Sequence, residues 1–347
     1  MLLPFEKILQ FMEKRILVTG ASGFIGSFLV QGGLDRGMRV WAGVRKTSSR
    51  KYLQDARICF AELDFADVKH LEQQLAAHKE EHGGWDYIIH CAGVTKCINK
   101  DGFEKGNFEA TRHFVETLQK LDMVPAQFLY ISSLSIFGPI REKDYTPICE
   151  GDRPQPNTAY GVSKLHTEEY LQGLKDFPYV IFRPTGVYGP RERDYFLMAQ
   201  SISRHVDTAA GFRRQDITFI YVEDLVQAIY LAIEKQVVRR AYFVSDGHVY
   251  ASKAFSDLIR KELGNPWMIR FTCPLALLKL ISLIAEAISH LTGKPSTLNS
   301  DKYKIMKQRN WQCDITPLIK ELGYKPAYPL ERGVKEIISW YKKEGWL

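Results

Sequence analysis

A tyrosine, a lysine and a serine-rich turn occupy positions from which they could transfer protons to and from a carbonyl oxygen. Tyr160 and Lys164 are four residues apart, so a helix here would place both side chains on one face. The segment SSLS at 132–135 follows an apolar run at 128–131 that predicts a strand. An unperturbed tyrosine has a pKa of about 10, and a nearby ammonium group favours its phenolate. These residues predict general acid–base chemistry on a ketone or an alcohol.

A glycine-rich turn near the start of the chain predicts a phosphate-binding site. The mostly apolar residues 15–19 are followed by GASGFIG and then by an apolar helical stretch, an order typical of strand, turn and helix. Gly20 would allow the sharp turn, Gly23 would let backbone N–H groups approach a pyrophosphate, and Gly26 would permit close packing of the helix on the strand. We expect contacts with a dinucleotide from Gly20, Ser22, Gly23, Phe24, Ile25 and Gly26.

Both motifs are similar to those of a known enzyme family. The G-x-x-G-x-x-G spacing after Thr19, and its order relative to Tyr160 and Lys164, resemble the extended short-chain dehydrogenase/reductase superfamily, also called NAD-dependent epimerase/dehydratase. The resemblance covers nearly the whole chain. It implies an α/β fold with a Rossmann-type doubly wound parallel sheet and a smaller, mostly helical C-terminal substrate domain. It also implies a homodimer that forms through the helices bearing Asn107 and Tyr160.

The resemblance assigns the catalytic serine. Counting back from Gly138 against the family pattern puts the catalytic hydroxyl at Ser133. In reduction, a nicotinamide supplies hydride to the carbonyl carbon, Tyr160 donates a proton to the oxygen, and Ser133 holds that oxygen by a hydrogen bond. The family lysine, here Lys164, also bonds the nicotinamide ribose. The expected catalytic set is therefore Ser133, Tyr160 and Lys164.

The residues after the second predicted strand indicate NADP(H) as the cofactor. NAD-specific enzymes place a carboxylate at the end of this strand, on the 2′-hydroxyl of the adenosine ribose. The strand predicted at 38–44 ends in Val44 instead, and Arg45 and Lys46 follow. A guanidinium could bind a 2′-phosphate with two hydrogen bonds. The alternative is that Arg45 is an ordinary solvated residue at a strand end.

Residues at other predicted strand ends complete the expected cofactor site. Asp64 ends the third predicted strand, 58–64, and resembles the family residue that reads the adenine amino group; a loop cap is the alternative. Small residues at 91–93 would let the backbone pass close to the nicotinamide ribose. Asn107 heads the next predicted helix, where it resembles a family asparagine or serves as an N-cap. The remaining expected contacts are Phe65, Cys91, Ala92, Gly93, Ile131, Pro184, Thr185, Gly186 and Val187.

Composition excludes several other classes of protein. The net charge of +7 is spread along the 347 residues, without the dense basic patch that nucleic-acid binding needs. The six cysteines lack metal-binding or disulfide-framework spacing, and we interpret them as reduced thiols of a cytoplasmic protein. The expected organisation is an N-terminal extension at 1–14 without a signal peptide, a dinucleotide-binding domain at 15–183 to which 216–248 return, and a substrate domain mainly at 184–215 and 249–347. Met12 is an alternative start.

Departures from the family pattern bear on the substrate. A 4,6-dehydratase carries an acidic pair after its catalytic hydroxyl, where this chain has Leu134 and Ser135. Nucleotide-sugar enzymes generally carry an asparagine and an arginine for substrate contact, where this chain has Gly186 and Ile217. A neighbouring arginine, 213 or 214, could replace the missing one. These departures favour a substrate other than a sugar nucleotide.

An amphipathic helical stretch at 274–291 points to an apolar substrate. Its polar residues recur at three- and four-residue steps and leave a wide apolar arc. The stretch is a poor membrane span, with a lysine and a glutamate inside it and fewer than about 20 apolar residues in a row. A core helix, a substrate lid and peripheral contact with the inner membrane surface stay open as its roles.

The leading hypothesis is an NADP(H)-dependent reductase of a hydrophobic ketone. Elements of the C-terminal region, from Leu298 to Tyr341, resemble 3β-hydroxysteroid dehydrogenase-like and 3-oxo-sphingoid reductase-like bacterial members of the superfamily. A long-chain 3-oxo lipid such as 3-ketosphinganine, or a steroid, is the implied substrate class. The alternatives are a nucleotide-sugar epimerase or reductase and, in another class, a non-catalytic NADP(H)-binding sensor or scaffold.

Overall fold

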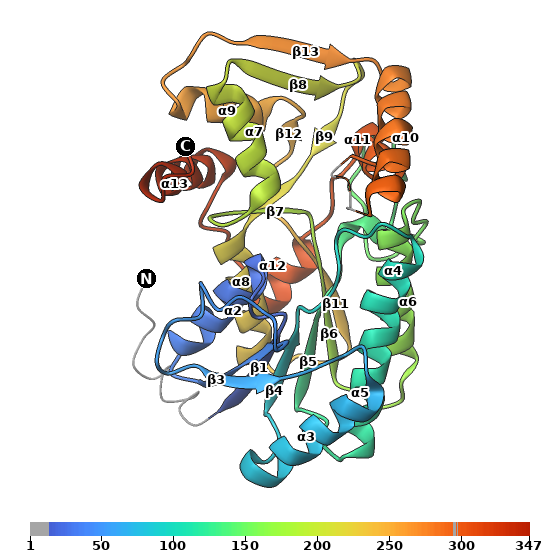
Figure 1. Ribbon diagram of the computed structural model, residues 1–347, viewed down its shortest axis with the longest axis vertical. Helices are drawn as coiled ribbons and strands as arrows, with labels where there is room; N and C mark the ends of the chain where they lie inside the picture. The colour runs from blue at the N-terminus through green and yellow to red at the C-terminus, as the bar shows by residue number, and fades with distance from the viewer. Residues whose placement is uncertain (1–13, 294–295, 297) are drawn as a thin grey trace.

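A seven-stranded parallel sheet is the centre of the larger part of the molecule. The structure is a computed structural model that describes residues 14–293, 296 and 298–347 (Figure 1). In chain order the strands are β1 (Arg15–Thr19), β2 (Arg39–Val44), β3 (Cys59–Glu62), β4 (Tyr87–His90), β5 (Gln127–Ile131), β6 (Tyr179–Pro184) and β11 (Arg240–Val244). They lie in the order β11-β6-β5-β4-β1-β2-β3, and every pair is parallel. The predicted doubly wound α/β fold is confirmed. The strand order reverses between β1 and β4, and ligands of such sheets bind outside the strand ends at this point.

Helices cover both faces of the sheet because alternate side chains of each buried strand are apolar on both sides. On one face, Ile16 and Val18 of β1 pack with α2 (Phe24–Leu34) and α8 (Val222–Glu234). On the other, Leu17 packs with the layer of α3 (Val68–His82) and α5 (Ala110–Lys120). Helix α6 (Ala159–Gly173) lies beside α5 on this second face (Figure 1).

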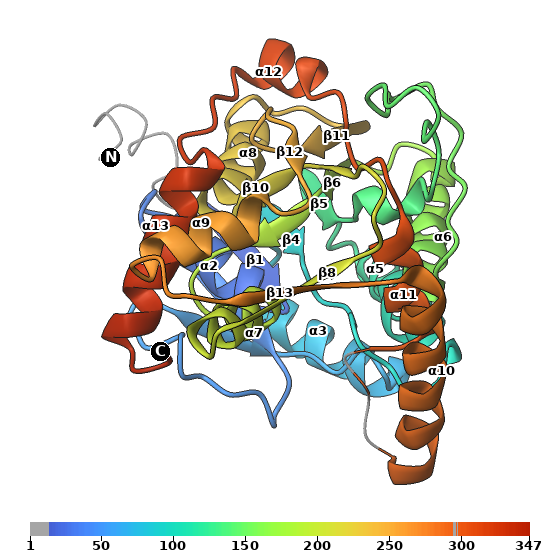
Figure 2. The same cartoon turned by 90° about the horizontal axis from the view of Figure 1, so that it is seen from above.

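A smaller part lies over the carboxyl ends of the strands and has its own aromatic core. Strands β7 (Gly186–Tyr188) and β10 (Phe219–Tyr221) pair in parallel at its base. Tyr188, Phe255 and Ile337 belong to a core built largely by three helices. The elements of this part are α7 (Arg193–Ser203), β8 (Val206–Ala210), β9 (Asp216–Ile217), β12 (Tyr250–Ala251), α9 (Ala254–Glu262), β13 (Ile269–Cys273), α10 (Leu275–Thr292), α11 (Ser300–Lys307) and α13 (Leu330–Lys343). Figure 2 shows this part from above.

The chain crosses between the two parts more than once. Strand β11 returns to the sheet beside β6. Helix α12 (Thr316–Leu322), within the C-terminal region expected to form mainly the substrate domain, also returns: its Leu318 and Leu322 are buried in the core formed by β1, α2 and α8. The expectations for a leader and for a start at Met12 concern residues 1–13, which lie outside the described residues.

A buried ion pair fixes α6 against the sheet. The Arg183 guanidinium on β6 donates to the Glu168 carboxylate on α6, with an Nη2–Oε2 distance of 2.6 Å, and both side chains are buried. Two hydrogen bonds from Arg183 Nε to the same carboxylate, at 3.0 and 3.2 Å, give the pair a defined geometry. Because Glu168 lies four residues beyond Lys164, the pair helps to set the position of α6 over the strand ends.

Candidate active site

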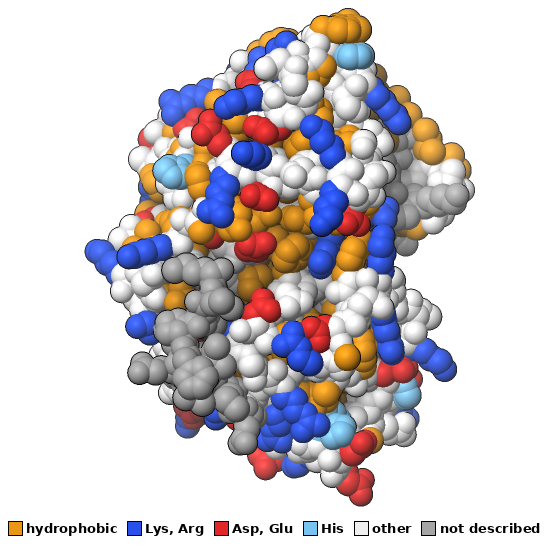
Figure 3. Space-filling view, turned by 90° about the vertical axis from the view of Figure 1, so that its left-hand side faces the viewer, with side chains coloured by type: hydrophobic (Ala, Val, Ile, Leu, Met, Phe, Trp, Pro, Cys, Tyr) orange, Lys and Arg blue, Asp and Glu red, His pale blue; other side chains and the backbone are white. Residues whose placement is uncertain are grey.

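One cleft brings together most of the residues predicted to act in catalysis and around the nicotinamide. It lies outside the carboxyl ends of the central strands, where the strand order reverses. Its lining residues are Ile25, Cys91, Gly93, Val94, Thr95, Asn107, Ile131, Ser132, Ser133, Tyr160, Lys164, Pro184, Thr185 and Val187. Figure 3 shows hydrophobic side chains gathered in a waist of the molecule, with basic and acidic side chains around them.

Tyr160 is placed in the cleft by the first turn of α6. Thr158 caps this helix, since its Oγ1 accepts a hydrogen bond from the Gly161 N–H at 3.0 Å. Burial raises the pKa of the Tyr160 phenol above its usual value, while a hydrogen bond with Ser133 acts in the opposite direction. The phenol therefore keeps its proton at neutral pH, the form that a proton donor needs.

Ser133 lies directly after β5, at the start of a short 3₁₀ turn. Its Oγ accepts a hydrogen bond from the Ser135 N–H at 3.2 Å and so caps the turn Leu134–Ile136. The hydroxyl can still donate a hydrogen bond to a substrate oxygen, because a serine hydroxyl carries one donor besides its acceptor lone pairs. The structure thus places the predicted serine next to the predicted tyrosine.

Lys164 is buried below the cleft with its ammonium held by the backbone. Its Nζ donates to the Ile131 carbonyl at 2.7 Å and lies 5.9 Å from the centre of the Tyr160 ring. Burial lowers the pKa of Lys164 to about 8, while Cys91 and Glu168 act in the opposite direction. At pH 7 the ammonium form still predominates. Burial also raises the pKa of Cys91 to about 11, so that side chain is a neutral thiol.

Asn107 is a positioning residue inside a helix, and the expectation that it heads one was wrong. The helix starts earlier, at α4 (Asp101–Phe103), and widens into the π-helical turn η1 (Glu104–Glu109) that contains Asn107. The buried side chain bonds the backbone of Val94 twice, accepting from N–H at 2.7 Å and donating to C=O at 3.1 Å, and also donates to Ser163 Oγ at 3.0 Å. It therefore ties the loop after β4 to α6. A π-turn of this kind has no hydrophobic periodicity by which sequence could reveal it.

The glycine turn can hold the phosphates of a dinucleotide. Gly20 has φ +65°, and a Cβ there would lie 2.8 Å from the backbone of Ala92. Gly23 is the N-cap of α2, and among the described residues no side chain caps this helix end and no acidic residue lies in its first turn. A Cβ on Gly26 would lie 2.1 Å from the Gly20 carbonyl oxygen, so the contact that requires glycine is with the turn itself. Helix N–H groups left open in this way form an anion site.

Two buried hydroxyl groups in the cleft are left without partners by the described residues. They are Ser132 Oγ, after β5, and Thr185 Oγ1, after β6. Burial of an unpaired hydroxyl costs about 1–3 kcal/mol, and functional sites are where such groups are found. A bound amide, carbonyl or hydroxyl group would satisfy both. Sequence reasoning missed Ser132, although its place beside Ser133 at a strand end was a usable signal.

The residues predicted to bind the adenosine part of the cofactor are more exposed than those of the cleft, and only some of them lie where they were expected. Arg45 and Lys46 are exposed directly after β2, and the Arg45 N–H donates to Ser48 Oγ at 3.1 Å. Strand β3 ends at Glu62, so Asp64 does not end it: Asp64 lies in the following turn and accepts from the Ala66 N–H at 3.0 Å. That bond is the loop cap considered as the alternative. The Phe65 ring packs edge-on against core aromatic rings.

The remaining residues that were predicted to contact the cofactor lie around the cleft, and they differ in how exposed they are. The Ala92 N–H donates to Thr19 Oγ1 at 3.2 Å and so fixes the loop after β4 to β1. Ser22 lies in the glycine turn, and the Phe24 ring packs edge-on against Phe28. Gly186 is exposed at the start of β7 and does not line the cleft; a Cβ there would lie 2.7 Å from the hydroxyl oxygen of a tyrosine on α7.

A doubly wound parallel sheet, an open glycine turn at its first helix and a serine–tyrosine–lysine cluster together define a dinucleotide-binding enzyme of the short-chain dehydrogenase class. Residues 16–245 match the NAD dependent epimerase/dehydratase family, and the chain belongs to this family. Such enzymes bind NAD(P).

The chain has relatives with different activities. It is 23% identical to a ceramide reductase of Caulobacter vibrioides over 96% of each chain. It is 26% identical to an uncharacterized UDP-glucose epimerase, YtcB, of Bacillus subtilis, covering 94% of this chain and 97% of that one. The crystal structure of a dTDP-glucose 4,6-dehydratase from Bacillus anthracis in complex with NAD has a similar fold, with a TM-score of 0.74, 19% identity, and coverage of 96% of this chain and 98% of that one.

Proposed function

We propose that this protein is an NADP(H)-dependent oxidoreductase that interconverts a ketone and a secondary alcohol on a hydrophobic lipid or sterol-like substrate. The observation that carries the reaction type is the placement of Ser133, Tyr160 and Lys164 in one cleft beside the open glycine turn. The lipid class is supported by the ceramide reductase among the relatives and by the missing contacts for a sugar nucleotide.

The residues of the cleft perform the proton transfer. The bound dinucleotide would supply the hydride, with its phosphates at the glycine turn and its ribose at Lys164. Tyr160 donates its phenolic proton to the carbonyl oxygen of the substrate while Ser133 holds that oxygen by a hydrogen bond. Lys164, fixed by the Ile131 carbonyl, keeps a positive charge below the phenol and stabilises the phenolate that remains. The unpaired hydroxyls of Ser132 and Thr185 would orient polar groups of the two ligands.

One of the two arginines that could bind a diphosphate group on the predicted substrate side is already paired within the protein. Arg214, one of the two arginines that could replace the missing family contact, binds Asp216 with two hydrogen bonds of 2.7 and 2.6 Å. Its guanidinium also lies 4.5 Å from the centre of the Tyr145 ring. Because a carboxylate already neutralises Arg214, only Arg213 of that pair is available to an anionic ligand. This favours an uncharged or weakly charged substrate over a sugar nucleotide.

A nucleotide-sugar epimerase is the second candidate, since relatives that cover almost the whole chain carry that name. NADPH consumption with a panel of 3-ketosphinganine, a 3-oxosteroid and UDP-glucose, and NAD⁺-dependent conversion of UDP-glucose to its epimer, separate the two. We expect the protein to oxidise NADPH with a lipid ketone at a rate well above its background. Epimerisation of the sugar nucleotide, with no turnover of any lipid ketone, would replace the proposal with the second candidate.

The cofactor preference can be tested at Arg45. Replacing Arg45 with aspartate should reverse the preference from NADPH towards NADH, because the carboxylate repels a 2′-phosphate and accepts a hydrogen bond from a 2′-hydroxyl. We expect NADPH affinity to fall by about 10-fold or more, the equivalent of about 1.4 kcal/mol, in titrations followed by cofactor fluorescence. The matched control is Arg57→Asp, which removes an arginine bonded to Asp55. If Arg45→Asp and the wild type showed the same preference between NADPH and NADH, Arg45 would be an ordinary solvated residue.

A further inference from the structure

Helix α10 exposes its apolar side to the surroundings. Of its 18 residues, only Leu278, Ser282 and Ser289 are buried. Figures 1 and 2 both place α10 at the outer edge of the molecule, with α11 alongside it. The large apolar side chains that α10 exposes are Leu277, Leu280, Ile281, Leu283, Ile284, Ile288 and Leu291. Helices on the surface of soluble proteins normally bury their apolar stripe, so this arrangement is the reverse of the expected one.

Hydrogen bonds on the polar side of α10 hold it in this orientation. Glu286 accepts a hydrogen bond from the Ser300 N–H at 3.1 Å, at the start of α11. The Ser289 hydroxyl accepts one from the Ser296 N–H at 3.2 Å. In the observed orientation the polar side of α10 makes these bonds and the apolar arc stays outside. Of the three roles left open for this stretch, a core helix is excluded, because the large apolar side chains of α10 are exposed.

The exposed apolar surface continues from α10 onto the strand that precedes it. Trp267 is 65% exposed and Phe271, on β13, is 56% exposed. Ile269 on β13 and Phe212, after β8, are also exposed. In Figure 3 hydrophobic side chains gather at the top of the molecule, where Figure 1 places β8 and β13. Together, α10 and these four residues form what we call the apolar edge.

The charges around the apolar edge are basic. Exposed Lys279 lies on α10, and exposed Arg204 and Arg213 flank β8. The nearby carboxylates are already bonded within the protein. Glu286 accepts a hydrogen bond from the start of α11, and Asp207 and Asp257 both bind Arg270. Asp216 forms an ion pair with Arg214. An apolar surface with a tryptophan and a rim of cations is complementary to a bilayer that carries anionic lipids.

The structure assigns the apolar edge to the surface of an anionic phospholipid bilayer, with the apolar side of α10 lying in the plane of the interface. Of the described residues, α10 is the one helix long and apolar enough to cross a membrane by length and composition. It lies on the membrane instead, because β13 and α11 at its two ends belong to the same part of the protein.

A second copy of the chain is a less suitable occupant. A two-fold dimer through the apolar edge would bring two copies of the same basic rim into one interface. The exposed side of α10 carries the charge of Lys279 but no carboxylate to offset it. Like charges at such an interface disfavour association, whereas anionic head groups would neutralise them.

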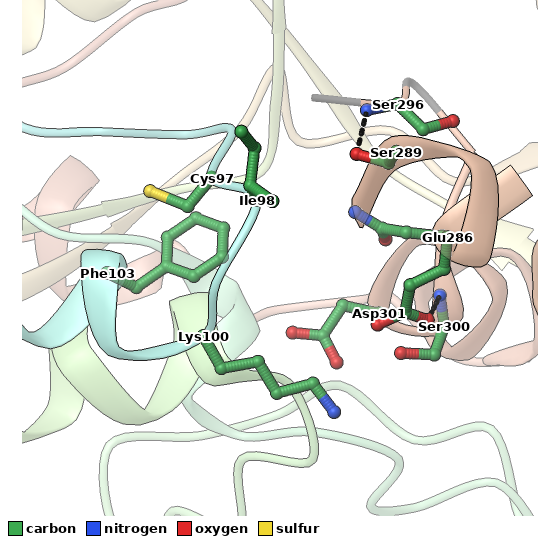
Figure 4. Close-up of a pocket in the computed structure, with 10 residues that line it drawn as sticks. Cys97, Ile98, Lys100, Phe103, Glu286, Ser289, Ser296, Ser300 and Asp301 are labelled. Carbon is green, nitrogen blue, oxygen red and sulfur yellow. Dashed lines mark hydrogen bonds between the residues drawn. The ribbon is translucent and has the colours of Figure 1, made fainter. Parts of the chain in front are cut away.

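The membrane contact would bring a lipid substrate close to the catalytic tyrosine; this consequence rests on the proposed function. Figure 4 shows a pocket between α10 and the loop before α4, with Glu286 and Ser289 on one side and Phe103 on the other. The Phe103 ring packs edge-on against the Tyr160 ring, with centroids 6.1 Å apart. Asp301 of α11, also in the pocket, accepts a hydrogen bond from the N–H of the residue before Tyr160 at 2.7 Å. Contacts of Phe103 and Asp301 thus link the inner side of α10 to the helix that carries Tyr160.

Co-sedimentation of the full chain with vesicles tests the assignment. We expect binding to vesicles made of phosphatidylglycerol and phosphatidylcholine in equal parts, and weaker binding to phosphatidylcholine alone. The double variant Leu280→Glu/Ile284→Glu should bind the anionic vesicles at least about 10-fold more weakly, because it puts two carboxylates into the apolar arc. Both side chains are more than half exposed, at 55% and 52%, so the variant should fold normally, which thermal melting checks.

The matched control is Val238→Glu/Ile319→Glu, which places the same charges on exposed apolar positions near the sheet and should bind as wild type does. Failure of the wild type to bind anionic vesicles would overturn the assignment. So would a wild-type dimer that the α10 variant dissociates, because the edge would then be covered by a second copy. Vesicle binding needs no turnover, so a protein that binds vesicles but reduces no lipid ketone would overturn only the proposed function.

Discussion

Replacing Tyr160 with phenylalanine is expected to lower the turnover of the preferred substrate by about 10²- to 10⁴-fold, since the variant loses its proton donor. The aromatic ring stays, so its edge-on contact with Phe103 and the packing of α6 should be kept. NADPH affinity should change little because Lys164 and the glycine turn are untouched. Steady-state assays and a cofactor titration on the same preparation measure the two effects.

The matched control for this substitution lies on the same helix. Tyr170 is also on α6, and its hydroxyl is buried without a partner among the described residues, so Tyr170→Phe should leave both turnover and cofactor binding unchanged. If Tyr160→Phe retained most of the wild-type rate, Tyr160 would not be the proton donor. If the wild type bound NADPH and turned over no substrate of the panel, the non-catalytic sensor would become the better interpretation.

Replacing Gly26 with alanine is expected to weaken NADPH binding by about 10-fold or more. The added Cβ would lie 2.1 Å from the Gly20 carbonyl oxygen and 2.9 Å from the Ala21 Cα, and both contacts are with backbone that cannot rotate away. The turn must shift, and with it the N–H groups that would bind the phosphates. Overpacking of this kind also costs about 1–3 kcal/mol of stability. Cofactor titration and thermal unfolding measure the two losses.

The control for Gly26→Ala is the same substitution at a helical glycine with open space around it. It distinguishes the steric clash at Gly26 from the general effect of placing alanine in a helix. A Cβ on Gly173, the last residue of α6, would meet nothing within 4 Å, so Gly173→Ala should bind NADPH as wild type does and be at least as stable. Normal cofactor affinity in Gly26→Ala would mean that the turn can move without loss, and the assignment of the phosphate site to this turn would have to be withdrawn.

The larger part of the fold could be predicted from the sequence because its signals are local. The apolar run of β1 has the predicted bounds, and β2 and β5 each differ from their predicted bounds by one residue at the first position. A buried parallel strand is apolar on both faces, so its limits coincide with the apolar run itself. The end of β3 was missed by two residues, since Asp64 follows the strand only after a turn that its own side chain caps.

The candidate site was partly predictable for the same reason. The four-residue step from Tyr160 to Lys164 and the spacing of the three glycines are properties of one helix and one turn. The role of Asn107 depends on three bonds to residues from two other segments, and the unpaired hydroxyl of Ser132 depends on what surrounds it. Neither follows from the residues next to them in the chain.

The sequence by itself determined the parallel sheet, the glycine turn and the paired tyrosine and lysine, because backbone periodicity and short spacings specify them. Only the tertiary structure decided which way α10 faces. Periodicity shows that a helix has an apolar side, but the direction of that side depends on how the helix packs in the folded chain, as in the bonds of Glu286 and Ser289 to the following segment. In the folded chain the polar side makes those two bonds and the apolar side is exposed.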